Sequence, residues 1–211
     1  MCEMQQINNM CEMQQINKAN RRLELFTEIN ENTATKLISE LRTIINEDEA
    51  IIEQNEKLSD AFKQPLEPVE IYFNSPGGSV IDGCAILSIM EEVEAPIIGH
   101  IIGTCGSMAV YLFLACDIRT GTRFSQIAVH GVGFHGYGGL TGYSKEIDSI
   151  NKNARDIGKM LDEELLLKKT KMTKKELEKT QTCLRFFNYK ECIKYKFFTH
   201  DIYSESAFVL N

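Results

Sequence analysis

Apolar and polar positions along the chain alternate with two different periods. Residues 22–27 alternate one by one, as in a half-buried strand. Residues 33–46 repeat their apolar positions every three or four residues, as in a helix, with Asn32 or Thr33 as the expected N-cap. Along the rest of the chain the same two periods predict, in order, strand 69–74, helix 80–92, strand 96–102, helix 108–116 and strand 124–129. Because strands and helices alternate, we predict an α/β fold with a parallel sheet.

The connections and the second half of the chain add three expectations. Residues 47–68 are acidic and contain two prolines, so we interpret most of this stretch as a surface insertion or contact loop. A long helix is predicted to begin near Tyr143, and its apolar stripe fits either a partner surface or the protein's own core. Thr173 and Glu176 have the spacing of a capping box that starts the next helix.

The N-terminus contains a tandem duplication. The eight letters MCEMQQIN at residues 1–8 recur at residues 10–17. Copies this short cannot build a solenoid, and their polarity predicts a disordered segment or a frayed helix. We therefore divide the chain into a duplicated segment, residues 1–20, and a single domain, residues 21–211.

Composition and charge narrow the function classes. The chain has 211 residues, 43% of them hydrophobic, which is enough for one sizeable core. A net charge of −7 argues against a nucleic-acid partner, because binding to phosphate backbones needs clustered Lys and Arg. Seven cysteines without a CxxC pair suggest free thiols in a reducing compartment and no metal site. The sequence has no apolar run typical of a signal peptide or membrane span, so we expect a cytoplasmic protein without a membrane partner.

A candidate nucleophile stands where an apolar strand gives way to an apolar helix, in the stretch GTCGSMA at residues 103–109. A serine at such a turn, here Ser107, has its hydroxyl lifted out of the sheet beside the free N–H groups of the helix. The alternative is an N-cap serine that ties down one of those N–H groups. Cys105 in the same stretch is interpreted as a small packing residue.

Paired glycines follow the strand 69–74, in the turn Ser75-Pro76-Gly77-Gly78-Ser79. Such a turn lets the backbone approach a phosphate, a carboxylate or a developing oxyanion. Neither GxxxxGK nor GxGxxG is present, which favours the oxyanion. Consecutive parallel strands would then place the N–H groups of Gly78 and Met108 beside the Ser107 hydroxyl, an arrangement suited to acyl transfer.

A nucleophilic serine needs a base, and the chain has four histidines. His130 is the first choice because it ends the predicted strand 124–129, at the same sheet edge as the glycine turn. His135, in the glycine-rich loop that follows, is the second choice. His100 lies inside an apolar strand and His200 near the C-terminus.

Three motifs in this order resemble one known family. They are IYFNSPGGSV at 71–80, the segment 101–114 around GSMA, and IAVH at 127–130. Together they resemble the proteolytic subunit of the Clp ATP-dependent protease, a family of serine peptidases, and the resemblance extends over residues 22–199.

The resemblance implies a Clp protease and crotonase type of fold, with stacked ββα units and a long handle helix. It implies Ser107 as nucleophile, His130 as general base, and the N–H groups of Gly78 and Met108 as oxyanion hole. It also implies protein or peptide substrates, a homo-oligomeric double heptameric ring, an ATP-driven AAA+ unfoldase as partner, and no cofactor or metal.

Three departures from the family pattern stand out. Leu184 occupies the position of the triad aspartate, which leaves Asn188, Thr182 or no group at all to orient the histidine. The loop 131–142 is longer and richer in glycine than the family's usual turn. The duplicated segment replaces the residues that in the family line the axial pore and meet the ATPase.

Two alternatives to an active peptidase follow. A catalytically impaired scaffold subunit, assembling with an active paralogue, would fit the missing acid. A crotonase-like acyl-thioester enzyme would use the same oxyanion hole without a nucleophilic serine, and the pairing of Ser107 with His130 disfavours it.

Overall fold

A six-stranded sheet forms the centre of the molecule. The computed structural model describes residues 19–131 and 144–203. The strands are β1 Arg22–Leu25, β2 Val69–Ser75, β3 Ile97–Gly106, β4 Ile118–Gly121, β5 Gln126–Val129 and β6 Arg185–Phe187. Their order is β1-β2-β3-β5-β6, with β4 beside β3. Strands β1 to β5 pair in parallel and β6 is antiparallel to β5, which confirms the predicted α/β class.

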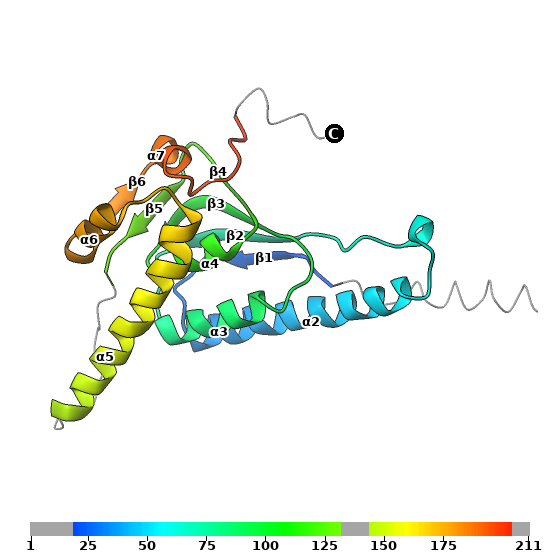
Figure 1. The fold of residues 1–211 in the computed structure, drawn as a ribbon, viewed down its shortest axis with the longest axis horizontal. Helices are drawn as coiled ribbons and strands as arrows, with labels where there is room; N and C mark the ends of the chain where they lie inside the picture. The colour runs from blue at the N-terminus through cyan, green and yellow to red at the C-terminus, as the bar shows by residue number, and fades with distance from the viewer. Residues whose placement is uncertain (1–18, 132–143, 204–211) are drawn as a thin grey trace, which may run out of the picture.

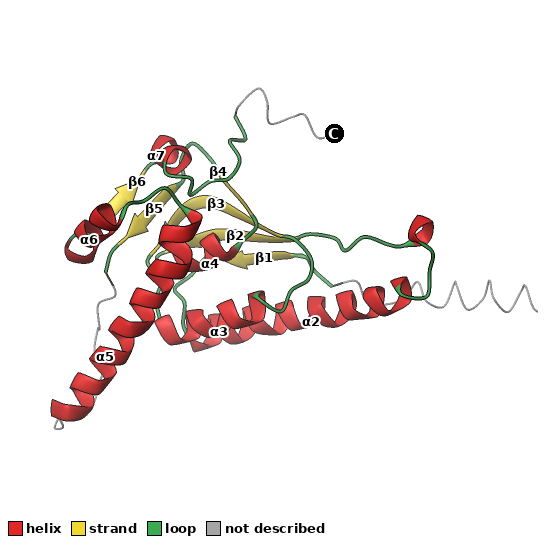
Figure 2. Cartoon of the chain, viewed as in Figure 1, coloured by secondary structure: helices red, strands yellow, loops and turns green. Residues whose placement is uncertain are grey.

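The described helices are α2 Glu31–Asn55, α3 Val80–Met90, α4 Met108–Ala115, α5 Ser144–Leu161, α6 Lys174–Thr182 and α7 Tyr189–Lys194. A 3-10 turn, Asp60–Phe62, follows α2, and a π-helical turn, Asp162–Leu167, continues α5. Figure 2 shows α2 and α3 together along one side of the sheet. Figure 1 shows α5 projecting away from the sheet, with its C-terminal end close to α4.

The core forms between the sheet and the helices α2, α3 and α4. Alternate residues of β2, Val69, Ile71 and Phe73, are buried, and Phe73 meets Phe113 of α4 edge to face with ring centroids 5.5 Å apart. Every residue from Met108 to Leu114 is buried, because α4 is apolar on all sides. The residue that precedes α4 is therefore attached to one of the most tightly enclosed helices of the fold.

Several element boundaries differ from those expected. Strand β3 does not stop at Gly103; it continues to Gly106, and the Thr104 N–H donates to Asn74 Oδ1 at 3.1 Å. Strands β4 and β6 were not predicted, because runs of three or four residues carry too little periodicity to recognise. The sheet therefore reaches closer to Ser107 than the pattern indicated.

The first helix is longer than expected and begins earlier. Its N-cap is Asn30, whose side chain accepts the Thr33 N–H at 3.1 Å while Thr33 Oγ1 accepts the Asn30 N–H. The expected cap at Asn32 or Thr33 is thus wrong, although Thr33 belongs to the capping box. The predicted capping box of Thr173 and Glu176 is confirmed at the start of α6.

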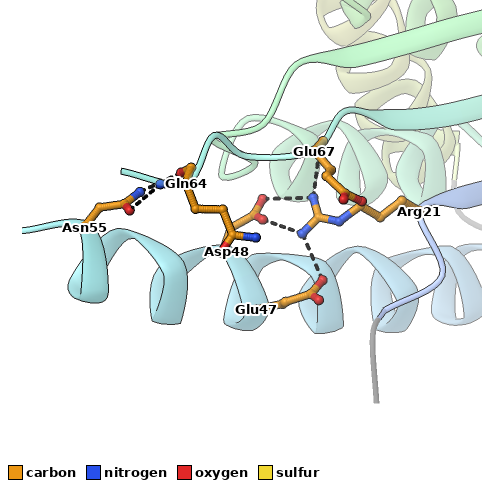
Figure 3. A network of polar contacts seen from close by, with 6 residues as sticks. All are labelled: Arg21, Glu47, Asp48, Asn55, Gln64 and Glu67. Atoms are coloured by element: carbon orange, nitrogen blue, oxygen red, sulfur yellow. Dashed lines mark hydrogen bonds and ion pairs between the residues drawn. The ribbon is translucent and has the colours of Figure 1, made fainter. Parts of the chain in front are cut away.

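A buried arginine ties the start of β1 to the second half of α2 (Figure 3). Arg21 Nη2 lies 2.5 Å from Asp48 Oδ1 and 2.9 Å from Glu47 Oε2, and Arg21 Nη1 donates to the Glu67 carbonyl at 2.7 Å. Because a buried charge is tolerated only when it is paired, this network holds α2 and the end of the 56–68 loop in one arrangement.

The C-terminal part of helix α5 packs against the core of the same chain. Leu161 is buried in the core and Ile157 packs against it, so the C-terminal part of the stripe faces the protein's own interior. Just beyond, Tyr111 of α4 donates to Asp162 Oδ1 at 2.8 Å, which fixes the end of α5 against α4. Within residues 19–131 and 144–203, none of the helices has the length and apolarity that a bilayer span needs.

Candidate active site

The glycine turn after β2 comes into direct contact with the turn before α4. Gly77 and Gly78 have φ values of 97° and 145°, a region that favours glycine. A β-carbon on Gly77 would lie 2.5 Å from the Gly106 carbonyl oxygen and 2.7 Å from Ser107 Cβ. Only a glycine allows this approach, so the two turns meet as the sequence predicted.

Ser107 has a strained backbone, and its hydroxyl makes no hydrogen bond within the described residues. Its φ of 51° and ψ of −125° are rarely adopted by a residue with a side chain, and its N–H donates to the Ala128 carbonyl at 2.8 Å. Its side chain makes no capping hydrogen bond to α4. The N-cap alternative for this serine therefore fails, because the hydroxyl is not used to close the helix.

Two backbone N–H groups are available beside Ser107. Ile29 donates to the Gly77 carbonyl and accepts from Ser79, each at 2.8 Å, so the N–H of Gly78 between them faces away from Ile29. Met108 begins α4, where N–H groups have no partner within the helix. Neither N–H donates to any residue that the structure describes.

His130 lies at the same rim, directly after β5. Strands β3 and β5 pair with Gly106 opposite Ala128, which places Ser107 and His130 at neighbouring strand ends. The imidazole is half-buried, and its Nδ1 lies 2.6 Å from the Gly131 carbonyl oxygen. No hydrogen bond joins Ser107 Oγ to His130 among the described residues.

The position expected for the triad acid is occupied by leucine. The antiparallel ladder of β5 and β6 ends with Val129 opposite Arg185, and His130 and Leu184 are the next residues beyond that pair. Its side chain is 49% exposed and carries no group that could accept a hydrogen bond. Arg185 points to the other face, where its guanidinium stacks over the Phe187 ring.

The two side chains that the sequence suggested as substitutes for the acid serve other purposes. Asn188 caps α7 by accepting the Glu191 N–H at 3.1 Å, and by register it lies opposite Gln126, at the far end of β5 from His130. Thr182 Oγ1 donates to the Lys179 carbonyl at 3.2 Å. Neither side chain bonds to His130, so both suggestions are withdrawn.

Two other histidines, His100 and His200, lie in the described residues and have partners of their own. His100 stacks on Tyr72 with ring centroids 4.9 Å apart, its Nδ1 lies 2.7 Å from Thr120 Oγ1, and burial lowers its pKa. His200 Nδ1 lies 2.8 Å from Thr199 Oγ1. His135 and the rest of the 132–143 segment lie outside the described residues, as does the duplicated segment up to residue 18.

Among the described residues, neither a cysteine nor a metal-binding cluster forms part of the candidate site. The cysteines in the described ranges are all free, and Cys105 is fully buried, which raises the pKa of its thiol well above its usual value. The described residues contain no group of His, Cys, Asp or Glu side chains arranged to hold a metal ion. A cavity of about 360 Å³ lies between α5, the π-helical turn and α6, and neither Ser107 nor His130 lines it.

A comparison with protein-family models assigns the chain to one family. The model described as Clp protease matches residues 5–202, which include every described strand and both Ser107 and His130. The chain belongs to the Clp protease family. The resemblance noted in the sequence is thereby confirmed, and the α/β fold is that expected of a Clp protease. Family membership supports a peptidase related to the Clp proteolytic subunit.

Proposed function

We propose that this Clp protease family member is a serine endopeptidase whose nucleophile is Ser107. The observation that carries the proposal is the environment of Ser107. Its backbone is strained, its hydroxyl does not cap α4, and it packs against the Gly77 turn. The N–H groups of Gly78 and Met108 make no hydrogen bond within the described residues. Backbone strain of this kind persists only where the surrounding structure enforces it, and it clusters at active sites.

The proposed reaction uses each of the four predicted site residues. Ser107 Oγ attacks the carbonyl carbon of a peptide bond while His130 Nε2 takes the hydroxyl proton. The oxyanion of the tetrahedral intermediate accepts hydrogen bonds from the N–H groups of Gly78 and Met108. The C–N bond then breaks as His130 returns the proton to the leaving amine. Water, activated by His130, hydrolyses the acyl ester and regenerates Ser107.

A fluorophosphonate probe tests this proposal because it reacts only with an activated serine. We expect labelling of the native protein, complete loss of labelling in Ser107→Ala, and unchanged labelling in Ser88→Ala, which removes an exposed hydroxyl on α3. Absence of labelling in the native, assembled protein would contradict the peptidase.

A second candidate, an impaired scaffold subunit, is favoured by one observation. Leu184 stands opposite His130 where a carboxylate would otherwise orient the ring. Loss of the acid in a Ser-His-Asp triad lowers turnover by about four orders of magnitude. A chain that forms rings with an active paralogue but stays unlabelled would support the scaffold over the peptidase.

The setting of the activity is proposed on family membership alone. We propose a cytoplasmic, homo-oligomeric double ring that encloses the sites, acts on protein or peptide substrates and receives unfolded chains from an AAA+ unfoldase. The native mass of the purified protein tests the ring: a mass of one chain at micromolar concentration would contradict it.

A further inference from the structure

The histidine at the proposed site has one close polar neighbour on its Nδ1 side. Nδ1 of His130 lies 2.6 Å from the carbonyl oxygen of Gly131, the next residue in the chain. A carbonyl oxygen has no hydrogen to donate, so the contact is attractive only when Nδ1 carries the hydrogen. The geometry therefore selects one of the two neutral tautomers of the ring.

Gly131 is also bonded, through its N–H, to a second part of the fold. Its N–H donates to the Thr180 carbonyl of α6 at 2.9 Å. Thr180 is 1% exposed, and its hydroxyl donates to the Leu177 carbonyl at 2.7 Å. The N–H lies in the peptide unit shared with His130, one Cα before the carbonyl that meets the ring, so the bond to α6 holds the backbone on the N-terminal side of that carbonyl.

A hydrogen on Nδ1 leaves the lone pair on Nε2, the nitrogen that must accept the serine proton. In a triad, an aspartate enforces this tautomer and also stabilises the imidazolium that forms during the reaction. A neutral carbonyl can do the first but contributes less to the second, because hydrogen bonds to charged groups are roughly twice as strong as neutral ones.

We propose that the backbone carbonyl of Gly131, a residue whose N–H is bound to α6 at Thr180, replaces the triad acid as the group that orients His130. The inference rests on the proposed peptidase function and names Gly131 as a positioning residue within it. It accounts for a site that keeps its serine, base and oxyanion donors although Leu184 occupies the position of the acid.

The tautomer of His130 is a direct test, because nitrogen NMR distinguishes Nδ1–H from Nε2–H without any catalytic turnover. The full-length protein is labelled with ¹⁵N-histidine, and the His130 signals are identified by their loss in His130→Gln. Spectra are recorded along a pH series, and the tautomer is read at the alkaline end, where the ring signals no longer change with pH. We expect the hydrogen on Nδ1.

Two substitutions test the anchor. Gly131→Pro removes the N–H that donates to Thr180, whereas Gly131→Ala keeps both the N–H and the carbonyl at a position without a positive φ. We expect Gly131→Pro to shift the His130 ring toward Nε2–H and to slow fluorophosphonate labelling by about tenfold or more. Gly131→Ala should keep the wild-type ring signals.

The outcomes separate this inference from the proposed function. A hydrogen on Nε2 in a protein whose Ser107 is labelled would overturn the role of Gly131 while leaving the peptidase intact. Absence of Ser107 labelling would overturn the peptidase whatever the tautomer. Unchanged ring signals in a folded Gly131→Pro variant would overturn the anchoring on α6.

Discussion

The two halves of the proposed site are built in different ways. On the nucleophile side, Ser107 stands between the end of β3 and the buried helix α4, its N–H is bound by Ala128, and the Gly77 backbone packs directly against it. On the histidine side, His130 follows the four-residue strand β5, and Leu184 in the facing position is half exposed. Among the described residues, one backbone carbonyl is the polar contact of its ring.

The serine and the histidine are therefore held in position by different kinds of interaction. The serine is positioned by core packing, which responds to almost any change of volume. The histidine is positioned by a single neutral hydrogen bond, worth about 0.5–1.5 kcal/mol in net stability. We therefore expect substitutions on the serine side to destroy the site and substitutions on the histidine side to tune it.

The largest effect is expected from Gly77→Ala. The new methyl group would sit within 2.7 Å of Ser107 Cβ and 2.5 Å of the Gly106 carbonyl, at a φ of 97°, so backbone must move to admit it. We expect fluorophosphonate labelling to fall by about three orders of magnitude, and the free energy of unfolding in urea to fall by about 1–3 kcal/mol. Near-normal labelling of this variant would show that the turn is not part of the site.

An opposite, gain-of-function effect is expected from Leu184→Asp. The register places the new carboxylate across from His130, where it can orient the ring and stabilise the imidazolium. We expect labelling to accelerate by about 10-fold to 100-fold. Leu184→Asn, equal in shape but uncharged, serves as the matched control, and equal rates for the two variants would remove the electrostatic explanation.

The smallest effect is expected on the stability of the protein at acid pH, through the Glu176 carboxylate at the start of α6. The Glu176 carboxylate accepts hydrogen bonds from the Thr173 N–H and hydroxyl and from the Tyr195 hydroxyl, which together lower the pKa of Glu176 to about 2. A depressed carboxylate pKa contributes stability above its unfolded value of about 4.3, and this contribution is lost as the pH falls toward 2.

The test compares urea unfolding of the wild type and Glu176→Gln from pH 7 to pH 2. We expect the wild type to be the more stable protein near neutral pH and the difference to shrink between about pH 4 and pH 2. Glu178→Gln, an exposed neighbour on α6, should show no such trend. A difference that stays constant with pH would refute the role of the capping box.

Much of the site could be predicted because its parts are local in sequence. The glycine pair after β2, Ser107 before α4 and His130 after β5 each follow a strand, and the carboxyl ends of parallel strands meet at one rim. The Gly131 contact could not be found this way. Backbone carbonyls are present at every residue, so the sequence has no letter that marks one as the partner of a histidine.

The sequence by itself determined the α/β class, the family and the three stretches that build the rim, because hydrophobic period and glycine spacing are properties of neighbouring residues. Tertiary structure alone decided what faces His130. The antiparallel register of β5 and β6 brings Leu184 to the strand end beside His130, and α6 binds the Gly131 N–H from about 50 residues away along the chain. Such contacts depend on how distant segments pair, which no local pattern records.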